Sequence, residues 1–297
     1  MHVQRFLGTA WATVHGSSDP RRLLISVLEA GFAGLAAAPG PRAVDWGALR
    51  DASRDLPFAF GAVRVGNPLT EGSPTQSLAS AKDGERAMAQ KSIHQAAQVA
   101  RQVKCPLVVV DLGVVPVFGE VEREDLGDPT YAWTHERAAA LRARANVGRN
   151  GALDRVCREL FSAVKSMPDI EFCLTQSRSA RAVADAAALQ DVFEDLGHLR
   201  LSYWHDAGLC ARREQVFGEA QGEWLEKFAN RCRGMTLGDA SSDGIYLPPG
   251  AGGVDYGILA TYVPRTGPAL PAVVELDTGV PPAELPGIRS CLDKFGL

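Results

Sequence analysis

Short apolar runs alternate along this chain with longer segments whose apolar residues recur at helical spacing. Several of the short runs are apolar almost throughout, as in "PLVVVDLG", and this is typical of parallel strands covered on both faces. The eight runs that we interpret as strands lie at 3–11, 32–37, 56–65, 106–113, 170–176, 199–206, 233–239 and 272–277.

The apolar spacing also predicts a helix after each of these strands. The segment 19–31 shows the signals most fully, because Asp19 can cap a helix, Pro20 suits its first position and Gly31 ends it. The other predicted helices lie at 44–53, 81–104, 152–167, 177–197, 214–231, 254–263 and 281–296.

Strands that are each followed by a helix predict an α/β fold, namely a single (β/α)8 TIM barrel over residues 1–297. A doubly wound open sheet is the alternative, but it usually carries a glycine fingerprint in its first turn, and "LGTAWATVHG" has none. A long insertion at about 114–151 follows the fourth strand. It is either a lid whose arginines face a substrate or a solvated excursion without ligand contact. The arginines in question are Arg142, Arg144 and Arg149.

Charge and composition narrow the class of protein. The net charge is −4, from 31 basic and 35 acidic residues, which does not favour a nucleic-acid partner. No apolar run is long enough for a membrane span, and the first residues lack the layout of a signal peptide. The 6 cysteines are scattered without metal-ligand spacing, so we expect reduced thiols and a cytoplasmic protein.

Polar side chains stand at the ends of the later predicted strands. Because the carboxyl ends of barrel strands meet at one face, we expect these side chains to converge. Carboxylates that end apolar strands are costly unless they are paired, hydrogen-bonded or metal-bound, so their convergence predicts a ligand site. The residues concerned are Asp111, Thr175, Gln176, His205, Asp206, Thr236, Asp239, Glu275 and Asp277.

The sixth predicted strand ends in "YWHD", residues 203–206. Neighbouring strand residues point to opposite faces, so Trp204 and Asp206 share one face and His205 takes the other. If Asp206 faces the barrel mouth, His205 points toward the helices as a structural histidine. Trp204 is then either an aromatic wall against a ligand or a core residue.

The glycine-rich stretch "LPPGAGGVDY" lacks the lysine and hydroxyl of a Walker loop. We interpret it as a turn that closes the barrel, either purely structural or presenting backbone amides near the site. Together with "VVELD" it resembles the xylose isomerase-like barrels, a family that includes sugar isomerases, sugar epimerases and family-2 AP endonucleases. The resemblance covers most of the chain. It implies a barrel that binds or converts a small polyhydroxylated, sugar-like ligand.

In that family a divalent metal such as Mn, Mg or Co is held by a Glu, an Asp, a His and a Glu on strands five to eight. The resemblance places two of these ligands at Asp206 and Glu275, which would also be the catalytic carboxylates. The strand-five Glu falls at Thr175 or Gln176, and the strand-seven His falls near Thr236 or Gly238. A substrate-contacting His is replaced by Leu209. The expected substrate contacts are Trp204, Asp111, Gln176, Asp239 and Trp11.

Two functions follow from this partial match. The first is an active sugar or sugar-phosphate isomerase or epimerase. The second is a barrel that has lost the family's metal chemistry and binds a small molecule or a protein partner. A DNA-repair endonuclease is a third alternative, which the 6 histidines and the negative net charge disfavour. The oligomeric state does not follow from the sequence.

Overall fold

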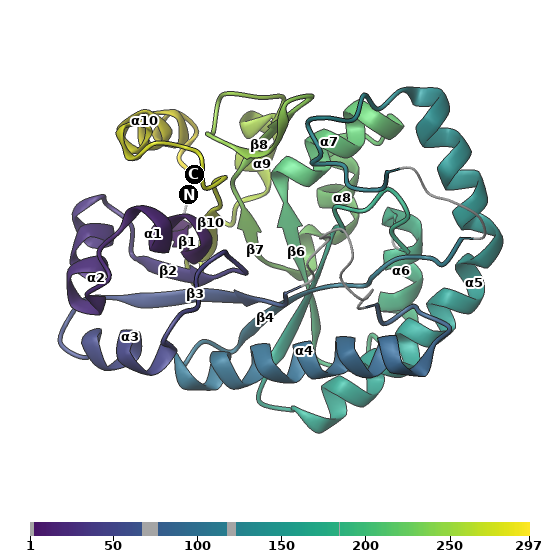
Figure 1. Cartoon of the computed structure of the whole chain (residues 1–297), viewed down its shortest axis with the longest axis horizontal. Coiled ribbons are helices and arrows are strands. Elements are labelled where there is room, and N and C mark those ends of the chain that lie inside the picture. Colours follow the sequence, from purple (N-terminus) through teal and green to yellow (C-terminus); the bar gives the residue numbers. More distant parts are fainter. Residues whose placement is uncertain (1–2, 67–76, 118–122, 184) are drawn as a thin grey trace.

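The computed structural model is a closed barrel of parallel strands surrounded by helices (Figure 1), which confirms the predicted (β/α)8 fold. It describes residues 3–66, 77–117, 123–183 and 185–297. Around the barrel the strand order is β1-β10-β7-β6-β5-β4-β3-β2. The barrel strands are β1 Val3–Gly8, β2 Gly34–Ala37, β3 Ala59–Arg64, β4 Leu107–Asp111, β5 Glu171–Thr175, β6 Leu201–Asp206, β7 Cys232–Thr236 and β10 Leu270–Val274. A two-stranded hairpin, β8 Asp239–Ser241 and β9 Gly244–Leu247, follows β7.

The helices match the predicted segments with four differences. The helix predicted at 177–197 is shorter and spans Ala186–Asp195. The first strand ends at Gly8 and a helix starts there, so the strand predicted to reach residue 11 was too long. A helix begins directly after Asp206, and the predicted helix 214–231 is divided at Gly218, whose φ of 72° ends the first part. The helix after β4 starts inside the predicted insertion, at His135. The helices are α1 Thr9–His15, α2 Pro20–Glu29, α3 Trp46–Ala52, α4 Asp83–Gln102, α5 His135–Ser166, α6 Ala186–Asp195, α7 Ala207–Phe217, α8 Gln221–Phe228, α9 Tyr256–Tyr262 and α10 Leu285–Phe295.

One layer of small and large side chains fills the inside of the barrel. Each of seven strands contributes one apolar residue to this cluster, and β7 contributes Gly234. A Cβ on Gly234 would lie 2.1 Å from the Trp204 ring, so the glycine makes room for the indole. The seven apolar residues are Phe6, Ala36, Ala62, Val109, Cys173, Trp204 and Val273.

Because side chains alternate along a strand, the residue two positions further on points to the same side, one layer closer to the carboxyl ends. This rule defines the mouth layer, the next ring of residues above the filled interior. Its members are Gly8, Ala38, Arg64, Asp111, Thr175, Asp206, Thr236 and Glu275. The mouth layer is therefore charged, whereas the layer below it is apolar.

The insertion after β4 is partly helical and is tied to the barrel by polar contacts. Its first part pairs with the segment after β5 through bridges at Val114 and Asp125. The second part is the beginning of α5, where Arg142 pairs with Glu219 and Arg149 lies 2.7 Å from Asp185. Both of these arginines therefore bind carboxylates of the protein itself.

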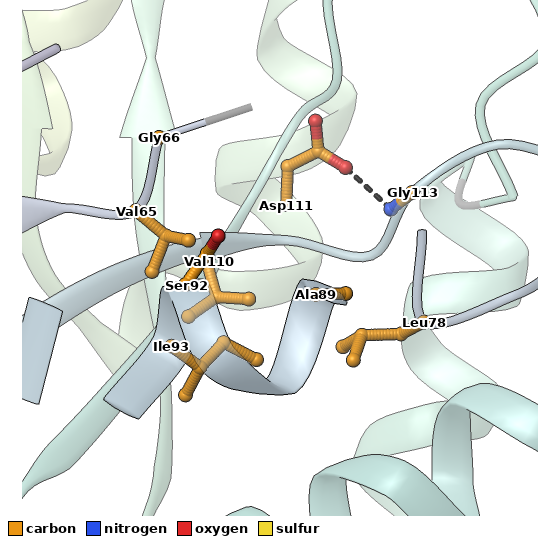
Figure 2. Close-up of a pocket in the computed structure, with 9 residues that line it drawn as sticks. All are labelled: Val65, Gly66, Leu78, Ala89, Ser92, Ile93, Val110, Asp111 and Gly113. Atoms are coloured by element: carbon orange, nitrogen blue, oxygen red, sulfur yellow. Dashed lines mark hydrogen bonds between the residues drawn. The ribbon is translucent and has the colours of Figure 1, made fainter. Parts of the chain in front are cut away.

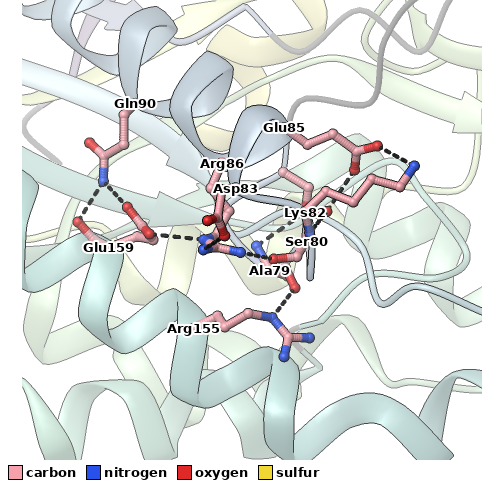
Figure 3. Close-up of polar contacts among 10 residues, drawn as sticks. Ala79, Ser80, Lys82, Asp83, Glu85, Arg86, Gln90, Arg155 and Glu159 are labelled. Carbon is pink, nitrogen blue, oxygen red and sulfur yellow. Dashed lines mark hydrogen bonds and ion pairs between the residues drawn. The ribbon is translucent and has the colours of Figure 1, made fainter.

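Polar contacts also join α5 to α4 (Figure 3). Glu159 of α5 accepts hydrogen bonds from Arg86 at 3.1 Å and from Gln90 at 2.7 Å. Arg155 donates to the carbonyl oxygen of Ala79 at 2.7 Å, which holds the segment before α4. None of the helices in the described ranges is both long enough and apolar enough to cross a membrane.

Candidate functional site

Arg64 and Asp206 form an ion pair in the mouth layer. The Arg64 Nη2 atom donates to Asp206 Oδ2 at 2.6 Å, and Nη1 donates to the Tyr246 hydroxyl at 2.6 Å. Asp206 is fully buried, whereas 23% of the Arg64 side chain is exposed. Burial lowers the pKa of the guanidinium, but the neighbouring Tyr246 and the Asp206 carboxylate outweigh this effect and raise it. The site therefore contains a permanent positive charge.

Asp206 is fixed by the backbone around it as well as by Arg64. Its Oδ1 atom accepts from the Leu209 amide at 3.1 Å and so caps α7. Its own amide donates to Gln176 Oε1 at 3.0 Å, and the Gln176 amide nitrogen donates to the Tyr203 hydroxyl. Gln176 is only 2% exposed. Gln176, one of the expected substrate contacts, therefore positions the end of β6.

Glu275 follows β10 in the mouth layer and is 7% exposed. Among the described residues none donates a hydrogen bond to its carboxyl group. Burial raises the pKa of Glu275 to about 7, with Arg64 lowering it and Asp206 raising it. The carboxyl lies against Gly8, where an added Cβ would be 2.4 Å from Oε2. Glu275 is thus a buried acid that can change its protonation state near neutral pH.

Asp239 organises the glycine-rich stretch 248–255. Its carboxylate accepts from the amides of Ala240, Gly250 and Val254, each at 2.9 Å, and it is fully buried. These bonds hold the stretch after β9 in place. The geometry favours the structural reading of this turn, with Asp239 as its anchor.

Trp204 and His205 point to opposite faces of β6, as the alternation predicted. Trp204 lies in the barrel interior, is 1% exposed and donates to Thr236 Oγ1 at 2.9 Å. This burial favours the core reading of Trp204. His205 faces the helix side, where Nδ1 lies 2.8 Å from the Tyr203 hydroxyl and Nε2 has no hydrogen-bond partner among the described residues. Burial lowers the pKa of His205 to about 3, so it is neutral at physiological pH.

The remaining two expected substrate contacts are Asp111 and Trp11. Asp111 ends β4, accepts from the Gly113 amide and borders a cavity of about 20 Å³ between β4 and α4 (Figure 2). That volume suits about one water molecule rather than a sugar. Trp11 donates to the Val280 carbonyl oxygen at 2.7 Å. It lines a separate pocket of about 150 Å³ with His15 and Leu285, between α1, α2 and the start of α10.

The residues present do not fit the divalent metal that the resemblance implies. Both carboxylate oxygens of Asp206 already accept hydrogen bonds, one from Leu209 and one from the Arg64 guanidinium. The described ranges contain no group of three or more His, Cys, Asp or Glu residues that is arranged to hold a metal ion. Leu209, where the resemblance expects a histidine, packs with Ala240 and Ile245.

Two residues of the site were missed by the sequence reasoning. Arg64 ends β3 and lies one residue before the end of the predicted strand 56–65, so a polar residue near that strand end was the signal available in the sequence. Tyr246 lies on β9 of the hairpin, and no strand periodicity predicted the hairpin. Its hydroxyl lies 3.5 Å from Asp206 Oδ2 as well as bonding to Arg64.

Comparison with solved structures identifies the fold. The 3-keto-D-glucoside 4-epimerase YcjR from E. coli aligns over 99% of this chain and 98% of its own, with a TM-score of 0.66 and 11% identity. D-psicose 3-epimerase from Clostridium cellulolyticum H10 aligns over 99% of this chain and 98% of its own, with a TM-score of 0.66 and 12% identity. An AP endonuclease of family 2 from Brucella melitensis aligns over 94% of this chain and 95% of its own, with a TM-score of 0.61 and 10% identity.

No protein-family profile matches the chain, and no curated protein is significantly similar to it in sequence. The similarity therefore lies in the fold, which this chain shares with these sugar epimerases and with the AP endonuclease.

Proposed function

We propose that the barrel mouth binds a small polyhydroxylated carbonyl compound of the sugar class, and that Glu275 moves a proton at the carbon next to the carbonyl group. The observation that carries this proposal is the convergence of an unbonded buried carboxyl group and a clamped guanidinium in one layer of the barrel. The sugar epimerases that share the fold support the choice of ligand class.

The chemistry requires one base and one group that stabilises negative charge. The Glu275 carboxylate removes the proton from the carbon next to the carbonyl, and the C–H electrons form a carbon–carbon double bond. The carbonyl oxygen becomes an enolate oxygen, and the N–H donors of Arg64 that Asp206 and Tyr246 do not use would stabilise its negative charge. Return of the proton from Glu275 to the same carbon restores the substrate. Its return to the former carbonyl carbon gives the isomer, provided that the proton of the neighbouring hydroxyl passes to the former carbonyl oxygen.

Hydrogen–deuterium exchange tests the first step without knowledge of the product. The protein is incubated in D2O with D-tagatose, D-fructose and L-ribulose, and the proton signals next to the carbonyl are followed by NMR. We expect loss of one signal with the wild type and no loss with Glu275→Gln. Glu226→Gln, which alters an exposed glutamate of α8, is the matched control.

A binding protein without chemistry is the second candidate. Its support is that Asp206, the second carboxylate expected to act on the substrate, has both oxygens engaged, which leaves Glu275 alone of the two expected catalytic carboxylates. A thermal-shift screen with the same sugars separates the two. Stabilisation without exchange supports binding alone, exchange supports the enzyme, and the absence of both contradicts the proposed ligand class.

A further inference from the structure

Arg64 is held in one orientation by two separate elements. Asp206 comes from the end of β6, and Tyr246 comes from the hairpin after β7, and each lies 2.6 Å from a different guanidinium nitrogen. A guanidinium has five N–H donors, and three of those on Arg64 have no acceptor within the described part of the chain. The group is thus a fixed, charged set of donors at the mouth of the barrel.

The clamp on Arg64 includes a strained residue. Tyr246 has φ of 61°, in the left-handed region that side chains other than glycine rarely adopt. Its carbonyl oxygen accepts from the Asp277 amide at 2.8 Å, which fixes the hairpin to the segment after β10. Strain of this kind persists where the surroundings impose it, and it concentrates at functional sites. Here it delivers the Tyr246 hydroxyl to Arg64.

The position of the guanidinium decides what else can bind. The guanidinium is hydrogen-bonded to Asp206, and its positive charge also interacts electrostatically with the Glu275 carboxyl group. These are the two residues at which the family resemblance places metal ligands. A divalent cation between them would meet a like charge and an aspartate without a free oxygen.

We infer that the Arg64 guanidinium is the resident cation of this site and takes the position and the electrostatic role that a divalent metal ion has in a metal-dependent barrel. The role concerns the same site as the proposed function and rests on it for the carbonyl oxygen that the guanidinium faces. The exclusion of metal rests on the geometry alone. Tyr246 acts as a positioning residue for the cation.

Manganese titration followed by the electron paramagnetic resonance signal of free Mn²⁺ tests the inference without any substrate. We expect Arg64→Met to bind one Mn²⁺ at least about tenfold more tightly than the wild type, because it frees Asp206 and removes the like charge. Arg64→Lys keeps the charge and should exclude Mn²⁺ as the wild type does. Arg178→Met, which removes an arginine paired with Asp125, is the matched control and should gain nothing.

Equal Mn²⁺ affinity of wild type and Arg64→Met would overturn the inference, as would tight binding by the wild type that Glu275→Gln abolishes. Arg64→Gln serves as a second neutral variant if Arg64→Met does not unfold cooperatively. The exchange experiment and this titration are independent. If the wild type catalyses no deuterium exchange but still excludes Mn²⁺, only the proposed function is contradicted. If the wild type binds Mn²⁺ tightly, only the inference that Arg64 is the resident cation is contradicted.

Discussion

The backbone of Gly8 lies directly against the carboxyl group of Glu275, so that a single added carbon at residue 8 would be 2.4 Å from Oε2. Gly8 ends β1, and Glu275 directly follows the neighbouring strand β10. Since Gly8 has φ of −66°, alanine suits the backbone there and only the contact with Glu275 opposes it. This contact gives a selective way to move the proposed base.

We predict that Gly8→Ala displaces Glu275 and reduces deuterium exchange at least about tenfold, at a cost of about 1–3 kcal/mol in the free energy of unfolding. Gly287→Ala is the matched control, because no atom lies within 4 Å of its added carbon, and it should leave exchange unchanged. NMR exchange rates and urea unfolding measure the two effects. Full exchange activity in Gly8→Ala would show that Glu275 is not the base.

Glu275 should also make stability depend on pH. Its pKa is raised by burial from 4.5 to about 7, so the unfolded chain loses the proton first as pH rises. Stability present below pH 4.5 is therefore lost between pH 4.5 and about 7, by about 3 kcal/mol. We expect Glu275→Gln to gain stability relative to the wild type across this window in urea unfolding. A constant difference between the two proteins would contradict the raised pKa.

His205 should make the protein less stable as the pH falls, whereas Glu275 makes it less stable as the pH rises. Burial lowers its pKa to about 3, so the stability that its neutral form provides is present above pH 6.5 and is lost as pH falls toward 3. The loss reaches about 1.4 kcal/mol for each pH unit in that window. We predict that His205→Gln unfolds less steeply with acid, as followed by circular dichroism. His94→Gln, at an exposed histidine of α4, should keep the wild-type slope.

The contacts of Glu159 predict a role in attaching α5 to α4. Glu159→Ala removes the acceptor of Arg86 and Gln90, both partly buried, and we expect a loss of about 1 kcal/mol. Glu226→Ala, at an exposed position of α8, should cost much less. Thermal unfolding of the two variants measures the difference. Equal costs would mean that the network contributes nothing to stability.

The barrel was predictable because its strands are nearly continuous apolar runs, such as Val108–Val110, separated by amphipathic segments. Two of the boundaries that failed share a cause, which is that one residue serves two elements. Gly8 ends a strand and begins α1, and Asp206 ends a strand while its side chain caps α7. The spacing of apolar residues does not show that a helix follows these two strands directly, without a loop between them.

The candidate site was only partly predictable. Asp206 and Glu275 were found because they are acidic strand ends, but the sequence does not show that Arg64 reaches across to Asp206. Tyr246 depends on a hairpin and on a left-handed backbone that its residue type disfavours. The partners of Asp239 and Gln176 likewise emerge only when segments distant in sequence meet.

The ion pair of Arg64 and Asp206 has a consequence for how the barrel assembles. Arg64 comes from the first four strands and Asp206 from the later ones, 142 residues further along the chain. The pair can form only when both halves of the barrel have met. Its formation therefore marks the closure of the barrel and not the early collapse of the chain. Arg64→Met should therefore speed unfolding while leaving the folding rate nearly unchanged, which makes this pair a marker of the last step in folding.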